Sequence, residues 1–145
     1  MKNLRQFWCG VMVGAVAALV LWGPFTLGGA QDNAQNATYE EELKRAKAAI
    51  EEALKKDPNN SELWVHLGYA ERNMQQIDQA QAAFEKAISL NPKNVTAHFM
   101  LGLIYEKKKL YSNARTSWRV CLENSQDQRI KEMARKHLTQ LEKNP

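Results

Sequence analysis

Hydrophobic and polar residues follow two different patterns along this chain of 145 residues. Residues 7–30 contain no charged side chain, whereas the later residues place apolar side chains every three or four positions among charged ones. As a helix, the uncharged run would be about 36 Å long, enough to cross a hydrocarbon layer of about 30 Å. The later pattern is typical of amphipathic helices. The sequence therefore predicts one hydrophobic N-terminal helix followed by an all-α domain.

Charges on the two sides of the uncharged run predict its orientation. Lys2 and Arg5 precede it, and the first charge after it is Asp32, followed by three glutamates at residues 40–42. Because basic residues stay on the cytoplasmic side, the N-terminus is expected in the cytoplasm and the remaining chain outside it. We therefore expect a single-pass protein of the cell inner membrane, with residues 7–30 in the membrane and the C-terminal domain in the periplasm.

A cleaved signal peptide is the alternative for residues 1–30. Residues 11–22 form a short apolar core, Gly23 and Pro24 interrupt it, and small residues precede a cleavage site near Ala30. Cleavage would give a soluble periplasmic protein, so both interpretations export the domain. We favour the uncleaved signal-anchor because the uncharged run is longer than the usual secretory core.

Small residues also recur every fourth position within this segment. Gly10, Gly14 and Ala18 form a pattern that lets two membrane helices approach closely, which is compatible with a homodimer. Ordinary composition is the alternative, since glycine and alanine are common in membrane helices.

The rest of the chain repeats itself at a fixed interval. Leu67 and Gly68 recur as Leu101 and Gly102, and further matches join Ala80 to Ala114, Phe84 to Trp118 and Pro58 to Pro92. All these matches share one period of about 34 residues, which is typical of stacked helical repeats.

These positions resemble the tetratricopeptide repeat family, whose pattern is W-x2-L-G-x2-Y, then A-x3-F, then P. The first repeat matches at Trp64, Leu67, Gly68, Ala80, Phe84 and Pro92, and the second at Leu101, Gly102, Tyr105, Ala114 and Trp118. Glu71 stands where tyrosine is usual, and His98 replaces the tryptophan. The resemblance implies a short right-handed α-solenoid.

The periodicity places the boundaries of this solenoid. A linker is expected at residues 31–37 and the repeat domain at residues 38–145, with full repeats at about 61–94 and 95–128. The expected helix pairs are 61–74 with 77–90 and 95–108 with 111–124. A single helix at 43–54 supplies half a repeat, and an amphipathic helix at about 127–143 caps the C-terminal end.

The chain shows no pattern of residues that carries chemistry. Without Lys2 and Arg5 it has 18 basic and 16 acidic side chains, with interspersed signs, so a nucleic-acid partner is not expected. The three histidines are spread over separate predicted helices without metal-ligand spacing, and no phosphate loop or nucleophile motif occurs. The two cysteines fall in the hydrophobic segment and in the predicted core. We therefore expect no catalytic residue, metal or cofactor, and no enzymatic activity.

The resemblance implies a protein or peptide partner held in a groove lined by the first helix of each repeat. Carried over position by position, the groove residues are Val65, Tyr69, Arg72, Asn73, Phe99, Leu103, Glu106 and Lys107. The apolar centre predicts an apolar peptide or helix as the partner, and an internal occupant from the same chain is the alternative. We expect a protein–protein interaction scaffold or adaptor of a bacterial cell envelope. The alternatives are an envelope assembly factor, for example in cytochrome c maturation, pilus or outer-membrane assembly, and a fixed accessory subunit of a larger membrane complex.

Overall fold

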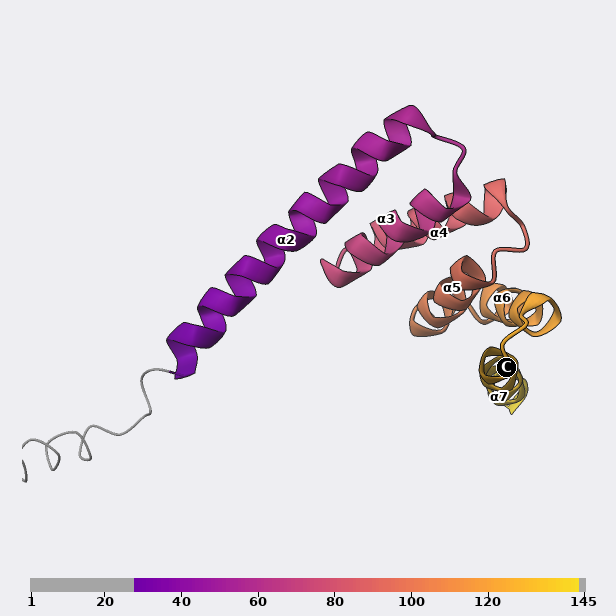
Figure 1. Cartoon of the computed structure of the whole chain (residues 1–145). Coiled ribbons are helices and arrows are strands. Elements are labelled where there is room, and N and C mark those ends of the chain that lie inside the picture. The colour runs from indigo at the N-terminus through magenta and orange to yellow at the C-terminus, as the bar shows by residue number, and fades with distance from the viewer. Residues whose placement is uncertain (1–27, 144–145) are drawn as a thin grey trace, which may run out of the picture. The chain divides into compact units, whose positions relative to one another are not determined.

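The computed structural model describes the backbone of residues 28–143 and the side chains of residues 37–143. Its helices are α2 (Gly28–Lys56), α3 (Ser61–Asn73), α4 (Ile77–Leu90), α5 (Val95–Lys107), α6 (Tyr111–Asn124) and α7 (Gln128–Lys143) (Figure 1). The chain divides into two compact units, residues 1–39 and 40–145. The paired helices all belong to the second unit.

Successive helices of this unit pack on one another in chain order. α3 packs on α4, α4 on α5, α5 on α6, and α6 on α7. The described residues thus form an all-helical array of helix pairs, and the predicted α-solenoid is confirmed. The helix pairs also begin and end close to the expected positions, because each boundary is marked by a local turn signal that recurs once per repeat.

The N-terminal part of the array differs from the expectation. The sequence predicts a helix at 43–54 after a linker at 31–37, but α2 begins at Gly28 and includes the expected linker. Residues 30–37 are Ala, Gln, Asp and Asn without proline or glycine, so no residue there stops a helix. The expected anchor and the Gly10, Gly14 and Ala18 pattern lie almost entirely in residues 1–27, outside the described residues. None of the helices in residues 28–143 is both long and apolar enough to span a membrane.

Two glycines mark the crossings of the helix pairs. A Cβ atom built on Gly68 would lie 2.7 Å from Cε1 of Phe84, and one on Gly102 would lie 2.7 Å from Cε2 of Trp118. Both rings are fully buried. Each aromatic ring of a second helix therefore occupies the space that a side chain would need on the first helix, and glycine is required there despite its low helix propensity.

His98 takes the structural role of the tryptophan that it replaces. The indole Nε1 of Trp64 donates to the carbonyl oxygen of Pro58 at 2.8 Å. Nε2 of His98 lies 3.0 Å from the carbonyl oxygen of Pro92, which can only accept, so Nε2 carries the proton. His98 is buried, and its Nδ1 has no hydrogen-bond partner among the described residues. His98 is therefore a packing residue of the core.

Asparagine side chains begin the first helix of each pair. The Asn60 side chain accepts hydrogen bonds from the backbone N–H groups of Glu62 and Leu63. The Asn94 side chain accepts one from the backbone N–H group of Ala97. Asn94 is also buried, and its amide group donates to the Ser61 hydroxyl and the Glu62 carboxylate. One side chain therefore both caps α5 and joins α5 to the start of α3.

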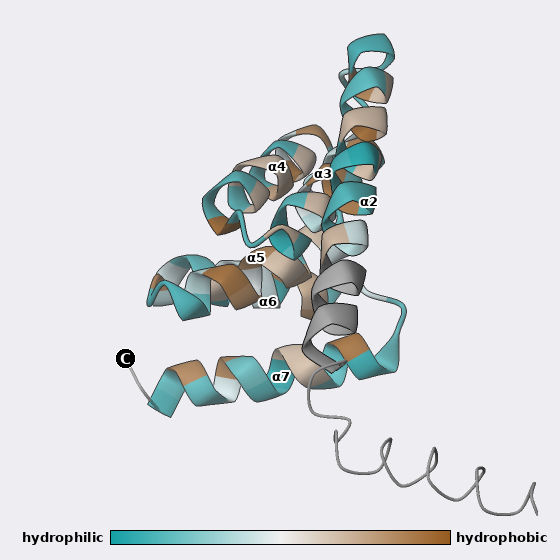
Figure 2. Ribbon diagram, turned by 90° about the vertical axis from the view of Figure 1, so that its left-hand side faces the viewer, coloured by the Kyte–Doolittle hydropathy of each residue, from teal (hydrophilic) through white to brown (hydrophobic). Residues whose placement is uncertain are grey.

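The C-terminal helix α7 closes the array. Its apolar residues Ile130, Ala134, Leu138 and Leu141 pack on the core, while its other side is hydrophilic (Figure 2). Arg135 and Lys136 stand one repeat period after Leu101 and Gly102. Both are exposed, so no helix within residues 28–143 covers α7 at these two positions. The capping role expected for this helix follows from these polar replacements.

We predict that Gly102→Leu destabilises the protein strongly. Lys136→Leu, at the equivalent position one repeat period later, should have little effect. The leucine at 102 would overlap the Trp118 ring, and such overpacking costs about 1–3 kcal/mol or more. Thermal unfolding followed by circular dichroism checks both variants. Equal melting temperatures for the two variants would contradict the helix crossing described above.

We also predict that acidification destabilises the protein through His98. Burial lowers the pKa of His98 below its ordinary value of 6.5. The unfolded chain therefore binds a proton at this residue as the pH falls below about 6.5, while the native chain does not, so this contribution to stability is lost on acidification. His98→Gln keeps an N–H donor for the Pro92 carbonyl but does not titrate.

The measurement is the free energy of unfolding between pH 7.5 and pH 5, from urea titrations of the parent and His98→Gln. The parent should lose more stability over this range than the variant does. Parallel pH profiles for the two proteins would show that His98 does not contribute.

Candidate functional site

The residues expected to face a partner lie on α3 and α5, the first helices of the two pairs. We call their surface the α3/α5 face; it consists of Tyr69, Arg72, Asn73, Phe99, Leu103 and Lys107. Arg72, Asn73 and Lys107 are exposed, and the three apolar residues are half-buried. The face therefore has an apolar centre bordered by polar and mostly basic side chains.

The apolar centre is built directly on the core. The Tyr69 ring meets Phe84 edge to face, with the ring centroids 5.6 Å apart, and the Phe99 ring meets Trp118 in the same way at 5.3 Å. Both inner rings are the ones that fill the glycine crossings. Tyr69 and Phe99 consequently present only part of their surface outward, and their truncation also removes packing from the core.

Arg72 joins the two repeats along this face. Its guanidinium lies over the Tyr69 ring, 5.6 Å from the ring centroid. Its Nη1 lies 3.9 Å from the sulfur of Met100, and its Nη2 donates to Asn73. Burial raises the pKa of Tyr69, and the nearby Arg72 charge partly opposes this rise. The Tyr69 phenol is therefore neutral and can donate a hydrogen bond.

Two expected groove residues have other roles. Val65 is only 2 % exposed and belongs to the core, so the expectation that it contacts a partner is wrong. Val65 belongs to the same core cluster as Met100 and Leu101 of α5. Glu106 is half-buried, and its carboxylate is already bound within the chain.

Glu106 instead fixes α7. The indole Nε1 of Trp118 donates to Oε1 of Glu106 at 2.6 Å, and Nδ1 of His137 lies 2.9 Å from the same atom. The His137 ring stacks on Trp118 with centroids 4.3 Å apart. Glu106 is thus an internal link and not a free part of the polar border. His137 was missed from the sequence, although it stands one repeat period after Leu103 and two periods after Tyr69, in the same column of the repeat.

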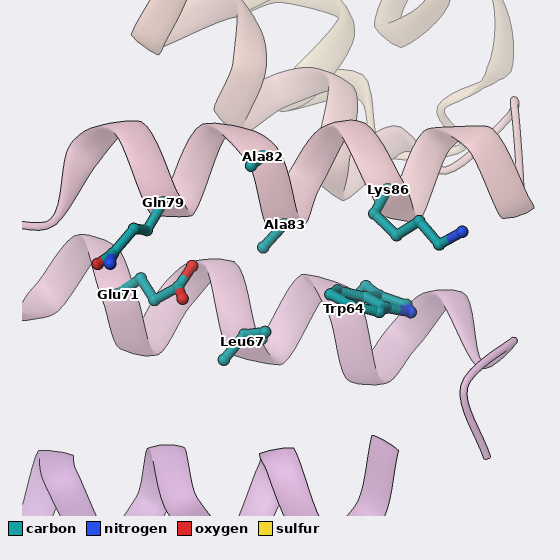
Figure 3. Close-up of a pocket in the computed structure, with 7 residues that line it drawn as sticks. All are labelled: Trp64, Leu67, Glu71, Gln79, Ala82, Ala83 and Lys86. Atoms are coloured by element: carbon teal, nitrogen blue, oxygen red, sulfur yellow. The ribbon is translucent and has the colours of Figure 1, made fainter. Parts of the chain in front are cut away.

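A pocket of about 370 Å³ lies elsewhere, between α3 and α4 (Figure 3). It is lined by Trp64, Leu67, Glu71, Gln79, Ala82, Ala83 and Lys86. We call it the α3/α4 pocket. Near it, Leu54 of α2 packs against Leu67 and Ala83. The expected site did not include this pocket, whose one visible signal in the sequence is the departure from the repeat pattern at Glu71.

An ion-pair chain connects Glu71 to α2. The Lys47 ammonium lies 3.2 Å from Oε1 of Glu71 and 3.8 Å from Glu51. In the next repeat the corresponding residue is Tyr105, whose hydroxyl donates to Glu85 of α4 at 2.9 Å. Burial and this carboxylate raise the pKa of Tyr105 to about 12. Glu85 stands one repeat period after Glu51, so the two repeats use equivalent carboxylates with different partners.

Metal binding has no visible basis in this part of the chain. Among the described residues no group of three or more His, Cys, Asp or Glu side chains is placed to hold a metal ion.

Comparisons with known proteins agree with this architecture. Models described as "TPR repeat" or "Tetratricopeptide repeat" match residues 68–109, 49–82 and 95–128. A solved structure described as the Arabidopsis OM64 TPR domain superposes with a TM-score of 0.61 at 24 % identity, covering 72 % of this chain and 88 % of that one. No curated protein matches the sequence. The matched models together extend over residues 49–128, more than half of the chain, and their repeats are typical of protein–protein interaction scaffolds. The chain belongs to the tetratricopeptide repeat family.

Proposed function

We propose that this protein is a non-enzymatic adaptor that binds an apolar peptide or helix of another protein on the α3/α5 face. The observation that supports the proposal most directly is the row formed by Tyr69, Phe99 and Leu103. Phe99 and Leu103 are four positions apart and therefore project from the same side of α5. Tyr69 occupies the Leu103 position of the preceding repeat.

The chemistry of the face fits such a partner. Half-buried aromatic side chains at the centre of an interface commonly supply most of its binding energy, and polar residues at the border exclude water. Arg72 and Lys107 are exposed at the border. They favour a partner whose apolar segment is flanked by acidic residues.

We further propose that the domain is exported and remains attached to the outer face of the cytoplasmic membrane through residues 7–30. The support is the uncharged run of the sequence, the basic residues before it and the acidic ones after it. Soluble release after cleavage near Ala30 is the alternative. An adaptor in that position would bring envelope proteins together, and a role in their assembly is compatible with the same surface.

Binding is tested by replacing Tyr69 and Leu103 together with alanine. We expect at least tenfold weaker recovery of partner proteins from solubilised membranes, because each buried anchor of an interface is worth about 1.4 kcal/mol or more. Leu110→Ala is the matched control, since Leu110 is 44 % exposed and lies outside the α3/α5 face. The readout is quantitative mass spectrometry of proteins recovered with each purified variant.

Circular dichroism must accompany this test, because Tyr69 also packs on Phe84. A folded double variant that recovers the same proteins as the parent would show that the partner binds another surface. Recovery that weakens equally in Leu110→Ala would show that loss of any apolar side chain suffices.

Export is tested with alkaline phosphatase, which is active only outside the cytoplasm, fused after Pro145. We expect enzymatic activity from the full chain and its loss when residues 1–30 are deleted. N-terminal sequencing of the mature protein then distinguishes an anchor, with Met1 retained, from cleavage near Ala30. An inactive fusion together with an active cytoplasmic reporter would exclude the proposed topology.

A further inference from the structure

One residue that lines the α3/α4 pocket, Glu71, departs from the repeat pattern. At the equivalent position of the next repeat, Tyr105 is only 6 % exposed, and its ring extends from α5 to Glu85 of α4. Glu71 is shorter and reaches only as far as the Lys47 ammonium. Ala83, which lines the pocket, stands where the next repeat has Ser117. Its methyl group is smaller than the serine side chain and carries no polar atom. Glu71 lines the α3/α4 pocket, so the first repeat has a shorter side chain at this position than the second.

The Glu71 carboxylate is incompletely bonded. Glu71 is 6 % exposed, and its Oε2 has no hydrogen-bond partner among the described residues. Figure 3 shows the carboxylate pointing into the space between α3 and α4. A buried carboxylate oxygen without a donor is costly, and a ligand that supplies a donor removes this cost. The terminal torsion of a glutamate side chain is soft, so Oε2 can turn toward a donor at small expense.

The charges around Glu71 favour a cation. Lys47 lies between the carboxylates of Glu71 and Glu51, so these three groups carry a net charge of −1. One further positive charge neutralises them. Lys86, the basic residue that lines the pocket, lies at the opposite end near Trp64 in Figure 3, with its amino group directed away from Glu71.

The middle of the pocket is apolar. Leu67, Ala82 and Ala83 lie between the Glu71 end and the Lys86 end (Figure 3). Lysine and arginine side chains combine a methylene stem with a charged head, and their stems commonly lie along apolar surfaces. The apolar middle of the pocket can contact such a stem, and the Glu71 carboxylate at its end can bind the charged head. The volume is near the small end of the range for ligand sites, about 300–1,000 Å³, and suits a side chain with its adjoining backbone.

We propose that the α3/α4 pocket binds a lysine or arginine side chain of a partner protein, with Glu71 accepting from its cationic head and Leu67 and Ala83 contacting its stem. Lys86 then favours an acidic residue elsewhere on the same partner segment. This site is separate from the α3/α5 face, so each site can be present without the other.

The first experiment fills the pocket. Glu71→Tyr places the family residue there and gives it Glu51 as the equivalent of the Glu85 acceptor, so the variant should melt at a higher temperature than the parent. Glu71→Gln keeps the shape and removes the charge. Glu123→Gln, an exposed carboxylate on α6, is the matched control. A Glu71→Tyr protein that melts well below the parent would contradict the open space on which the proposal depends.

The second experiment selects ligands with the purified full chain and a displayed library of short random peptides. We expect a class of peptides that share a lysine or arginine and bind at least tenfold more weakly to Glu71→Gln and Glu71→Tyr. Their binding should be unchanged by Glu123→Gln and by Leu103→Ala on the α3/α5 face. Replacement of the shared basic residue by norleucine should weaken binding to the parent by a similar factor.

Three results would overturn the proposal. The selection yields no peptides that depend on Glu71, or the dependent peptides lack a basic residue. Alternatively, sedimentation of the parent shows a dimer that Glu71→Tyr dissolves, which would make a second copy of the chain the occupant. Peptides that depend on Leu103 alone would support the α3/α5 face and still count against this pocket.

Discussion

The close approach of each first helix to the aromatic ring of its partner is the constraint on which the other features depend. At Gly68 and Gly102 the ring of Phe84 or Trp118 takes the place of a side chain. The same buried ring also contacts an aromatic residue of the α3/α5 face: Phe84 meets Tyr69, and Trp118 meets Phe99. The candidate binding surface is therefore an extension of the core. Its aromatic residues are held in position by the same contacts that hold the helix pairs together, which lowers the entropic cost of presenting them to a partner.

Most of this architecture could be predicted from the sequence, because the same residue pattern occurs in two successive repeats. Leu101, Gly102 and Trp118 occur in the same register as their counterparts one repeat earlier, and each pair of matches predicts a packed position. The substitution of His98 for tryptophan was also interpretable, since both side chains offer an N–H to a proline carbonyl. Periodicity determines which side of a helix is buried.

Periodicity does not determine which neighbouring side chain reaches a given polar atom, and this explains the errors. Val65 occupies a position that often faces the groove, but it is buried in the core cluster that also contains Met100 and Leu101 of α5. Glu106 was expected to face the groove, but its carboxylate is bound by His137. His137 belongs to α7, beyond the whole of α6, so the local sequence around either residue does not predict this contact. The start of α2 was missed for a different reason: a polar segment without a stop signal is compatible with both a linker and a helix.

The two ends of the array adapt the repeat in different ways. α7 has exposed polar residues at the positions that a following helix would cover, and this is consistent with a capping role. Glu71 makes the opposite change near the other end, where a buried acidic group replaces an aromatic ring and leaves part of its hydrogen-bonding capacity unused. Lys47 compensates for the charge but not for the missing volume or for the second oxygen. Departures from local consistency of this kind reduce stability, and in natural proteins they concentrate at functional sites. The physical cost of Glu71 is thus the reason to look for its ligand in the α3/α4 pocket as well as on the surface that the family resemblance indicates.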